Sequence, residues 1–135
     1  MSRGRRLAVT GLGAALVAAV LNTGVAAVAH AAGVDLEVSG GEAIPVSGIA
    51  FVTVVLSALG VLIAAALSRW SDSPVQWWLR TTVALTAVSL VPPFVAAADA
   101  ATAVTLVALH LLAAAVVVPT VARTLRAAAR SEPAR

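Results

Sequence analysis

Long apolar runs, almost free of charge, alternate with short polar segments along this chain. The four runs cover residues 7–32, 49–67, 81–98 and 100–122, which are 26, 19, 18 and 23 residues long. As helices that rise about 1.5 Å per residue, they would measure about 39, 28, 27 and 34 Å. About 20 apolar residues cross a hydrocarbon core about 30 Å thick, so each run is predicted to span a membrane. The expected fold is therefore all-α, an integral membrane bundle of four antiparallel helices that forms a single domain.

Three polar segments connect or follow the predicted spans. They are an outer loop at 33–48, an inner loop at 68–80 and a cytoplasmic tail at 123–135. The outer loop contains the pair Gly40-Gly41 among acidic residues, so we expect a turn-rich connector there. The short link between the last two spans predicts a tight helical hairpin.

The composition supports a membrane protein. Hydrophobic residues make up 61% of the 135 residues and charged residues 11%, whereas a soluble domain typically has about a quarter charged residues. This composition excludes a soluble enzyme, a disordered tail and a nucleic-acid-binding module. The chain has no cysteine and two histidines, so we expect no disulfide, no metal site and no cofactor.

The distribution of arginines predicts the orientation. With four spans, all nine arginines fall on one side of the membrane: Arg3, Arg5, Arg6, Arg69, Arg80, Arg123, Arg126, Arg130 and Arg135. Four of the six acidic residues fall on the other side: Asp35, Glu37, Glu42 and Asp99. Cytoplasmic flanks collect Arg and Lys, so both termini are predicted to face the cytoplasm from a bacterial cytoplasmic membrane.

All three tryptophans lie in the predicted inner loop. Pro74 separates Trp70 from Trp77 and Trp78, and we expect it to break any continuous helix. Indole rings favour the headgroup level of a bilayer, so the three side chains are predicted to anchor this loop at the membrane interface. Binding of a partner protein is the alternative.

The first run also has features of a secretory signal peptide. Arginines precede it, and Ala29-His30-Ala31 has the form of a signal-peptidase site. A signal peptide, however, usually has an apolar region of about 7–15 residues, which is much shorter than this run. We therefore expect an uncleaved span and keep cleavage as the alternative.

Each predicted span has one face of small or polar residues. These faces include Ala15, Ala18, Ala19, Asn22 and Ala26 on the first span, Thr53, Ser57, Gly60 and Ala64 on the second, and Thr82, Thr86, Ser89 and Pro93 on the third. Small residues allow membrane helices to approach closely, so these faces are predicted to pack together. Gly11 and Gly13 lack the third glycine and the preceding strand of a dinucleotide fingerprint, and they also indicate close helix packing.

Polar side chains from all four spans lie at a similar predicted depth. Asn22, Ser57, Ser89 and His110 provide one each, and Asp99 lies on the same face as His110, nearer the outer end. Polar groups inside a bilayer are costly and often functional. A pocket is therefore predicted around six residues: Asn22, Ser57, Ser89, Pro92, Asp99 and His110. A structural His110, hydrogen-bonded to Ser89 or Asn22, is the alternative.

The pattern resembles a family of small actinobacterial integral membrane proteins. The residues that carry the resemblance are Ser89-Leu90-Val91-Pro92-Pro93, Ala98-Asp99, Thr102 and His110, together with Pro45 and Gly48 of the outer loop. The resemblance covers about residues 5–125. It implies four spans, and it implies no activity and no catalytic residues.

These observations favour a non-enzymatic membrane protein that binds a lipophilic molecule or partner helices through a polar-centred bundle. Besides the bilayer, its expected partners are a lipophilic small molecule and either a second copy or another membrane protein. One alternative is a subunit of a transporter or channel, which would have to oligomerise to enclose a pore. The other is a membrane enzyme acting on a lipid-like substrate, with His110 and Asp99 as proton carriers.

Overall fold

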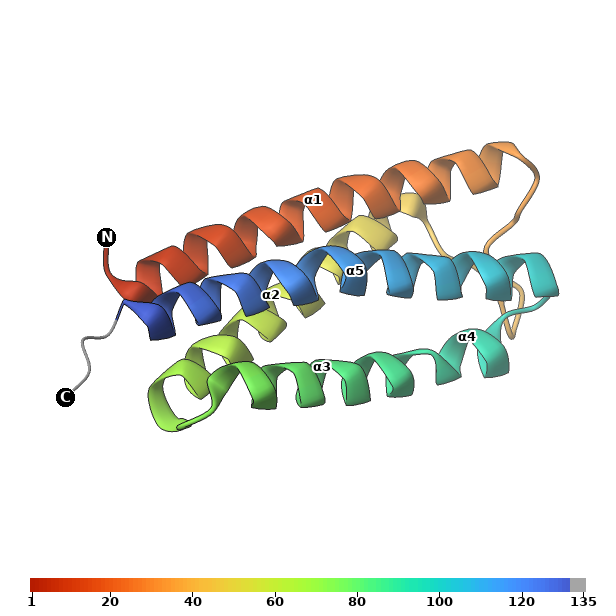
Figure 1. Ribbon diagram of the computed structural model, residues 1–135. Coiled ribbons are helices and arrows are strands. Elements are labelled where there is room, and N and C mark those ends of the chain that lie inside the picture. The colour runs from red at the N-terminus through yellow and green to blue at the C-terminus, as the bar shows by residue number, and fades with distance from the viewer. Residues whose placement is uncertain (132–135) are drawn as a thin grey trace.

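The computed structural model describes residues 1–131, which form a bundle of long helices (Figure 1). The helices are α1 (Arg3–Ala31), α2 (Val46–Trp70), α3 (Pro74–Ser89), α4 (Val91–Ala96) and α5 (Ala100–Arg130). Because α4 continues α3, the described chain has four helical segments long and apolar enough to cross a membrane. The predicted all-α, four-helix fold is confirmed.

Small residues let α1 pack closely against its neighbours. The predicted face of α1 is buried, from Ala15 through Asn22 to Ala26. A Cβ atom added to Gly11 would lie 2.5 Å from Cγ2 of Val61 in α2, so the two helices approach too closely there for a larger residue. Gly11 therefore has the packing role that the sequence indicates.

The predicted inner loop at 68–80 is mostly helical instead. Helix α2 extends through Trp70 and α3 begins at Pro74, so residues 71–73 alone connect them. Pro74 occupies the first turn of α3, where a backbone N–H has no helical partner to lose. The helix is therefore interrupted just before Pro74, as predicted, and Pro74 begins the next helix.

At the end of the chain, α5 runs on to Arg130, well past the predicted end of the last span at residue 122. The predicted tail at 123–135 is thus helical over most of its described part. Its last four residues, 132–135, which include Arg135, lie outside the described residues.

The third membrane-length segment is interrupted once, at Leu90. Helix α3 ends at Ser89 and α4 begins at Val91. Pro92 and Pro93 follow directly, and neither has an N–H group to continue the helical hydrogen bonds. The two prolines account for the break.

The outer loop, predicted as a turn-rich connector, contains a small two-stranded sheet. Strands β1 (Glu37–Val38) and β2 (Glu42–Ala43) pair antiparallel across a turn at Gly40 and Gly41, where φ is +106° and +79°. Glycine adopts such positive φ values without steric cost. The other edge of β1 pairs with the α4–α5 connection, where the Ala98 amide donates to the Glu37 carbonyl over 2.9 Å. The hairpin is therefore fastened to the α4–α5 connection at this end of the bundle.

Leu36, just before β1, inserts into the bundle. Its side chain is 1% exposed and belongs to a cluster with Ala26, Ile49, Leu106 and Leu109, which come from α1, α2 and α5. Its φ of +54° is unusual for a residue other than glycine and places a leucine in the left-handed region. Burial of this side chain offsets that strain and closes the hairpin end of the bundle.

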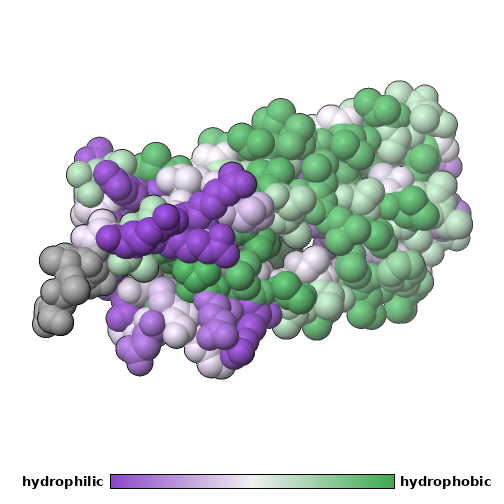
Figure 2. All heavy atoms as spheres, in the orientation of Figure 1, coloured by the Kyte–Doolittle hydropathy of each residue, from purple (hydrophilic) through white to green (hydrophobic). Residues whose placement is uncertain are grey.

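The two ends of the bundle differ in charge. We call one the arginine-rich end, because it carries the eight arginines among residues 1–131: Arg3, Arg5, Arg6, Arg69, Arg80, Arg123, Arg126 and Arg130. Figure 2 shows hydrophilic atoms gathered at this end and hydrophobic atoms over the middle of the bundle. The acidic residues of the opposite, hairpin end are Asp35, Glu37, Glu42 and Asp99. This asymmetry is the one that the sequence predicts from four spans.

Candidate functional site

Asn22 lies in the contact between α1 and α2. It is 3% exposed, and its Nδ2 group donates to the Thr53 hydroxyl oxygen over 3.2 Å. The Thr53 hydroxyl in turn donates to the Ile49 carbonyl over 2.7 Å. The Asn22 Oδ1 atom is buried without a hydrogen-bond partner among residues 1–131. The Asn22 amide thus joins two helices rather than facing a cavity.

Other members of the predicted pocket bond within their own segments. The hydroxyl of Ser89 donates to the Thr86 carbonyl over 2.7 Å. Nδ1 of His110 lies 2.6 Å from the Leu106 carbonyl, one turn earlier in α5. Nδ1 carries the hydrogen in this bond, since a carbonyl oxygen only accepts. His110 thus bonds within its own helix, whereas Ser89 and Asn22, its expected structural partners, bond to other residues.

Asp99 caps the start of α5. Its carboxylate accepts hydrogen bonds from the backbone N–H of Thr102 over 2.8 Å and from the Thr102 hydroxyl over 2.9 Å. These two hydrogen bonds, the backbone one foremost, lower the pKa of Asp99 below its ordinary value. No hydrogen bond joins Asp99 to His110 in the described chain, so the structure does not pair them as proton carriers.

None of the six predicted residues lines either of the two cavities described below. Ser57 is buried on α2 and Pro92 is exposed. The polar groups of Asn22, Ser89, Asp99 and His110 form hydrogen bonds within or between helices. A pocket formed by all six residues stays a prediction.

The three tryptophans have different surroundings. Trp70 is 83% exposed, and Trp77 is half exposed with the Arg80 guanidinium 5.5 Å from its ring centre. Trp78 is 1% exposed, and its Nε1 group donates to the Val118 carbonyl of α5 over 3.1 Å. Trp78 therefore packs inside the bundle. The prediction that it faces the membrane interface is wrong.

An apolar groove lies between α3 and α5, which we call the α3–α5 groove. Its volume is about 460 Å³. The lining residues are Thr82, Val83, Thr86, Ala87, Leu90, Ala114, Ala115, Val118 and Pro119. This lining contains two hydroxyl side chains and no charged residue, so the groove suits a hydrocarbon.

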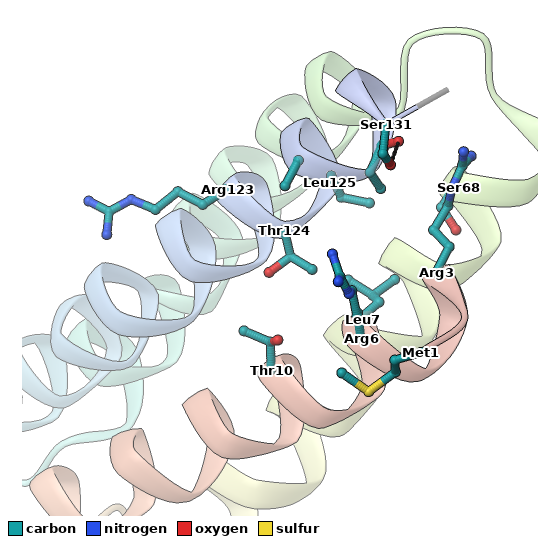
Figure 3. A pocket seen from close by; sticks show the side chains of 12 residues that line it. Met1, Arg3, Arg6, Leu7, Thr10, Ser68, Arg123, Thr124, Leu125 and Ser131 are labelled. Atoms are coloured by element: carbon teal, nitrogen blue, oxygen red, sulfur yellow. Dashed lines mark hydrogen bonds between the residues drawn. The ribbon is translucent and has the colours of Figure 1, made fainter. Parts of the chain in front are cut away.

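A second cavity lies at the arginine-rich end, between the start of α1 and the end of α5 (Figure 3). We call it the basic cavity, and its volume is about 580 Å³. The lining residues are Met1, Arg3, Arg6, Leu7, Thr10, Ser68, Arg123, Thr124, Leu125, Ala127, Ala128 and Ser131. In Figure 3 the Arg6 side chain reaches into the space between the two helices, whereas the Arg123 guanidinium points away from it. Arginine side chains line one side of this cavity, and apolar side chains line the other.

Neither cavity is predicted from the sequence, although the sequence contains a signal for the basic cavity. Arg3, Arg6 and Thr10 recur at spacings of three and four, which places them on one face at the start of α1. In the sequence, the arginines near the N-terminus indicate membrane orientation and a signal peptide, and neither interpretation involves a cavity. The α3–α5 groove has no such signal, because its lining is mostly Ala, Val and Leu.

A model described as a family of unknown function (DUF6069) matches residues 2–127. Comparison with curated proteins and with solved structures found no match. Within residues 1–131, no three histidine or acidic side chains come together in a group that could hold a metal ion. The cavities themselves therefore have to supply the evidence for function.

Proposed function

Since the chain belongs to this uncharacterised family, DUF6069, and has four helical segments apolar enough to span a membrane, we propose that it is a non-enzymatic membrane protein that holds the hydrocarbon tail of a lipid-like molecule. The α3–α5 groove is the observation that carries the proposal. The proposal includes a bacterial cytoplasmic membrane as the location and both termini in the cytoplasm. The actinobacterial source implied by the resemblance also remains a prediction.

The groove arises because α3 is attached to the bundle near its two ends. At the arginine-rich end, Trp78 inserts toward α5. At the hairpin end, Pro93 is buried and Ala97 pairs with Val38. The third segment is the least buried of the four: 11% of the residues in its most apolar stretch are buried, against 33% for α1. An empty apolar groove in a bilayer would fill with hydrocarbon.

The size of the groove favours a lipid tail over a helix. From Thr82 to Leu90, α3 rises about 12 Å, and a helix of that length and about 10 Å diameter would occupy roughly 900 Å³. The groove holds about 460 Å³, half of that. A slender hydrocarbon chain can lie inside the groove, whereas a partner helix would lie largely outside it.

Of the two hydroxyl groups that line the groove, one is bonded already. The Thr82 hydroxyl donates to the Trp78 carbonyl over 2.8 Å. Such a lining recognises its occupant by shape and apolar contact, so we assign the groove to a tail and not to a headgroup. No observation specifically favours the transporter or the enzyme, because Asp99 caps a helix and His110 bonds to its own helix.

Native mass spectrometry of the protein, released from its own membrane in mild detergent, tests this proposal. Ala87 lines the groove, whereas Ala84 lies exposed on the same helix outside it. We expect the wild type and Ala84→Leu to retain a small amphiphilic molecule, and Ala87→Leu to lose at least four fifths of it. Equal retention by both variants would refute the groove. A retained polypeptide instead of a small molecule would assign the groove to a partner helix, contrary to the proposal.

A further inference from the structure

Arginine side chains from two helices border the basic cavity. Arg3 and Arg6 lie one turn apart at the start of α1, and Arg123 comes from α5. No acidic residue is among the described residues that line the cavity. The side chains of Arg6 and Arg123 form no ion pair or hydrogen bond with any residue in 1–131. Of these two guanidinium groups, that of Arg6 points into the cavity, so an anion bound there would pair with it.

Hydrogen-bond donors accompany the charge. Thr10 lies one turn after Arg6 on the same face of α1, and its hydroxyl has no hydrogen-bond partner in the described chain. In Figure 3, Thr10 lies near Arg6 and faces Thr124 of α5, whose hydroxyl already donates to the Thr120 carbonyl over 3.0 Å. The N-terminus of α1 adds the positive end of the helix dipole. Guanidinium and hydroxyl groups in this arrangement suit a phosphate, which accepts several charge-assisted hydrogen bonds.

The remaining wall of the basic cavity is apolar. Leu7 and Leu125 are 2% and 3% exposed at its floor, and Ala127 and Ala128 line the side formed by α5. A free phosphate ion gains nothing from such a wall. A phospholipid places its phosphate beside the beginning of its apolar tails, so its chemistry matches both sides of the cavity.

The position in the bundle also fits a lipid. The cavity lies at the arginine-rich end, where the apolar surface meets the charged surface (Figure 2). Basic pockets between membrane helices on the cytoplasmic side bind anionic headgroups. From these observations we propose that the basic cavity binds the phosphate headgroup of an anionic phospholipid, with Arg6 and Thr10 as its principal donors.

This site is separate from the α3–α5 groove. The groove uses α3 and α5, whereas the basic cavity uses α1, the end of α2 at Ser68, and the last turns of α5. The two cavities share no lining residue. Each proposal can therefore fail without the other.

A titration with two lipids tests the charge requirement. The delipidated full chain in detergent is titrated with phosphatidylglycerol, which is anionic, and with phosphatidylcholine, which has the same phosphate but no net charge. Binding is followed by native mass spectrometry. We expect the wild type to prefer phosphatidylglycerol, and Arg6→Gln to bind it about fivefold more weakly. Arg5→Gln is the matched control, because Arg5 is adjacent and exposed but does not line the cavity. Equal losses in the two variants would show diffuse surface attraction and would overturn the proposal.

A second pair of variants tests the cavity while keeping every charge. Ala128 lines the cavity, and its exposed neighbour Ala129 does not. We expect Ala128→Phe to weaken phosphatidylglycerol binding at least fivefold and Ala129→Phe to leave it within twofold. Unchanged binding by Ala128→Phe would overturn the proposal, and this variant decides the matter if Arg6→Gln does not fold. Displacement of the lipid by an equal concentration of inorganic phosphate would assign the cavity to a soluble anion and refute the lipid.

Discussion

The indole Nε1 group of Trp78 donates to the main-chain carbonyl of Val118, 3.1 Å away, and this bond ties α3 to α5. The same ring lies against α2, where its Cη2 atom would be 3.6 Å from a Cβ atom added to Gly60. Trp78 thus contacts two helices besides its own. This contact fixes one end of α3, and beyond it α3 and α5 enclose the α3–α5 groove.

Replacement of Trp78 by phenylalanine should destabilise the bundle. The change removes the hydrogen bond to Val118 and part of the buried ring, so we expect a loss of about 1–3 kcal/mol in the free energy of unfolding. Unfolding in mixed micelles, followed by helical circular dichroism, measures this loss. Trp70→Phe is the control: its ring is 83% exposed, and its effect should stay within about 0.5 kcal/mol. Equal effects of the two changes would contradict the packing role of Trp78.

Replacement by alanine should destabilise the protein at Gly11 but not at Gly13. A Cβ atom at Gly11 would lie 2.5 Å from Val61, whereas one at Gly13 has no neighbour within 4 Å. We expect Gly11→Ala to cost about 1–3 kcal/mol through overpacking, and Gly13→Ala to cost nothing. The same unfolding assay compares them. Addition of Val61→Ala should restore part of the loss in Gly11→Ala, and the absence of any rescue would argue against this contact.

The bond between Asn22 and Thr53 should give a measurable coupling. Their side chains join α1 to α2 over 3.2 Å, in a region where hydrogen bonds between membrane helices contribute about 0.6 kcal/mol on average. A double-mutant cycle with Asn22→Ala and Thr53→Val should show a favourable coupling of about that size. Strictly additive single effects would mean that the two side chains do not interact.

Acid should weaken the cap that Asp99 provides. Hydrogen bonds from Thr102 hold the pKa of Asp99 in the folded protein below its ordinary value of 3.8. The cap therefore contributes fully above the pKa of the unfolded chain, and its contribution is lost as the pH falls through the folded-state pKa. Asn also caps helices but does not titrate. The Asp99→Asn variant should therefore lose less stability than the wild type between about pH 5 and pH 2, as measured by thermal unfolding. Parallel losses would show that the Asp99 carboxylate makes no such contribution.

The four long helices could be predicted from the sequence because a bilayer strongly restricts the structure of a long apolar segment. A run of about 20 apolar residues has few structures other than a spanning helix. The small face of α1, from Ala15 to Ala26, is buried as its periodicity predicts. Trp78 precedes Thr82 by one turn and therefore shares its buried face, so the same periodicity places Trp78 inside the bundle. The prediction of an interfacial position for Trp78 rests on residue type alone, which this periodicity outweighs.

Other features depend on contacts that a local pattern does not contain. Gly40-Gly41 between short alternating segments is a signal for a β-hairpin, but the pairing of that hairpin with Ala97 joins residues far apart in the chain. The positive φ of Leu36 likewise depends on its burial among three helices. Both cavities depend on how far neighbouring helices stand apart, which hydrophobic periodicity alone does not specify.

Both proposals include an orientation, in which the arginine-rich end faces the cytoplasm and the hairpin end faces outward. Because the sequence contains no cysteine, single cysteines report this orientation without background. Glu42 lies exposed in the hairpin, and Ser73 lies exposed in the turn between α2 and α3. Neither side chain forms a hydrogen bond within the described residues, so Glu42→Cys and Ser73→Cys should both fold.

The most direct measurement is labelling of these two variants with a membrane-impermeant maleimide on intact cells and again after permeabilisation. Glu42→Cys should react on intact cells, and Ser73→Cys should react after permeabilisation alone. The reverse pattern would contradict the orientation, and equal reaction of both variants on intact cells would contradict a membrane-spanning bundle.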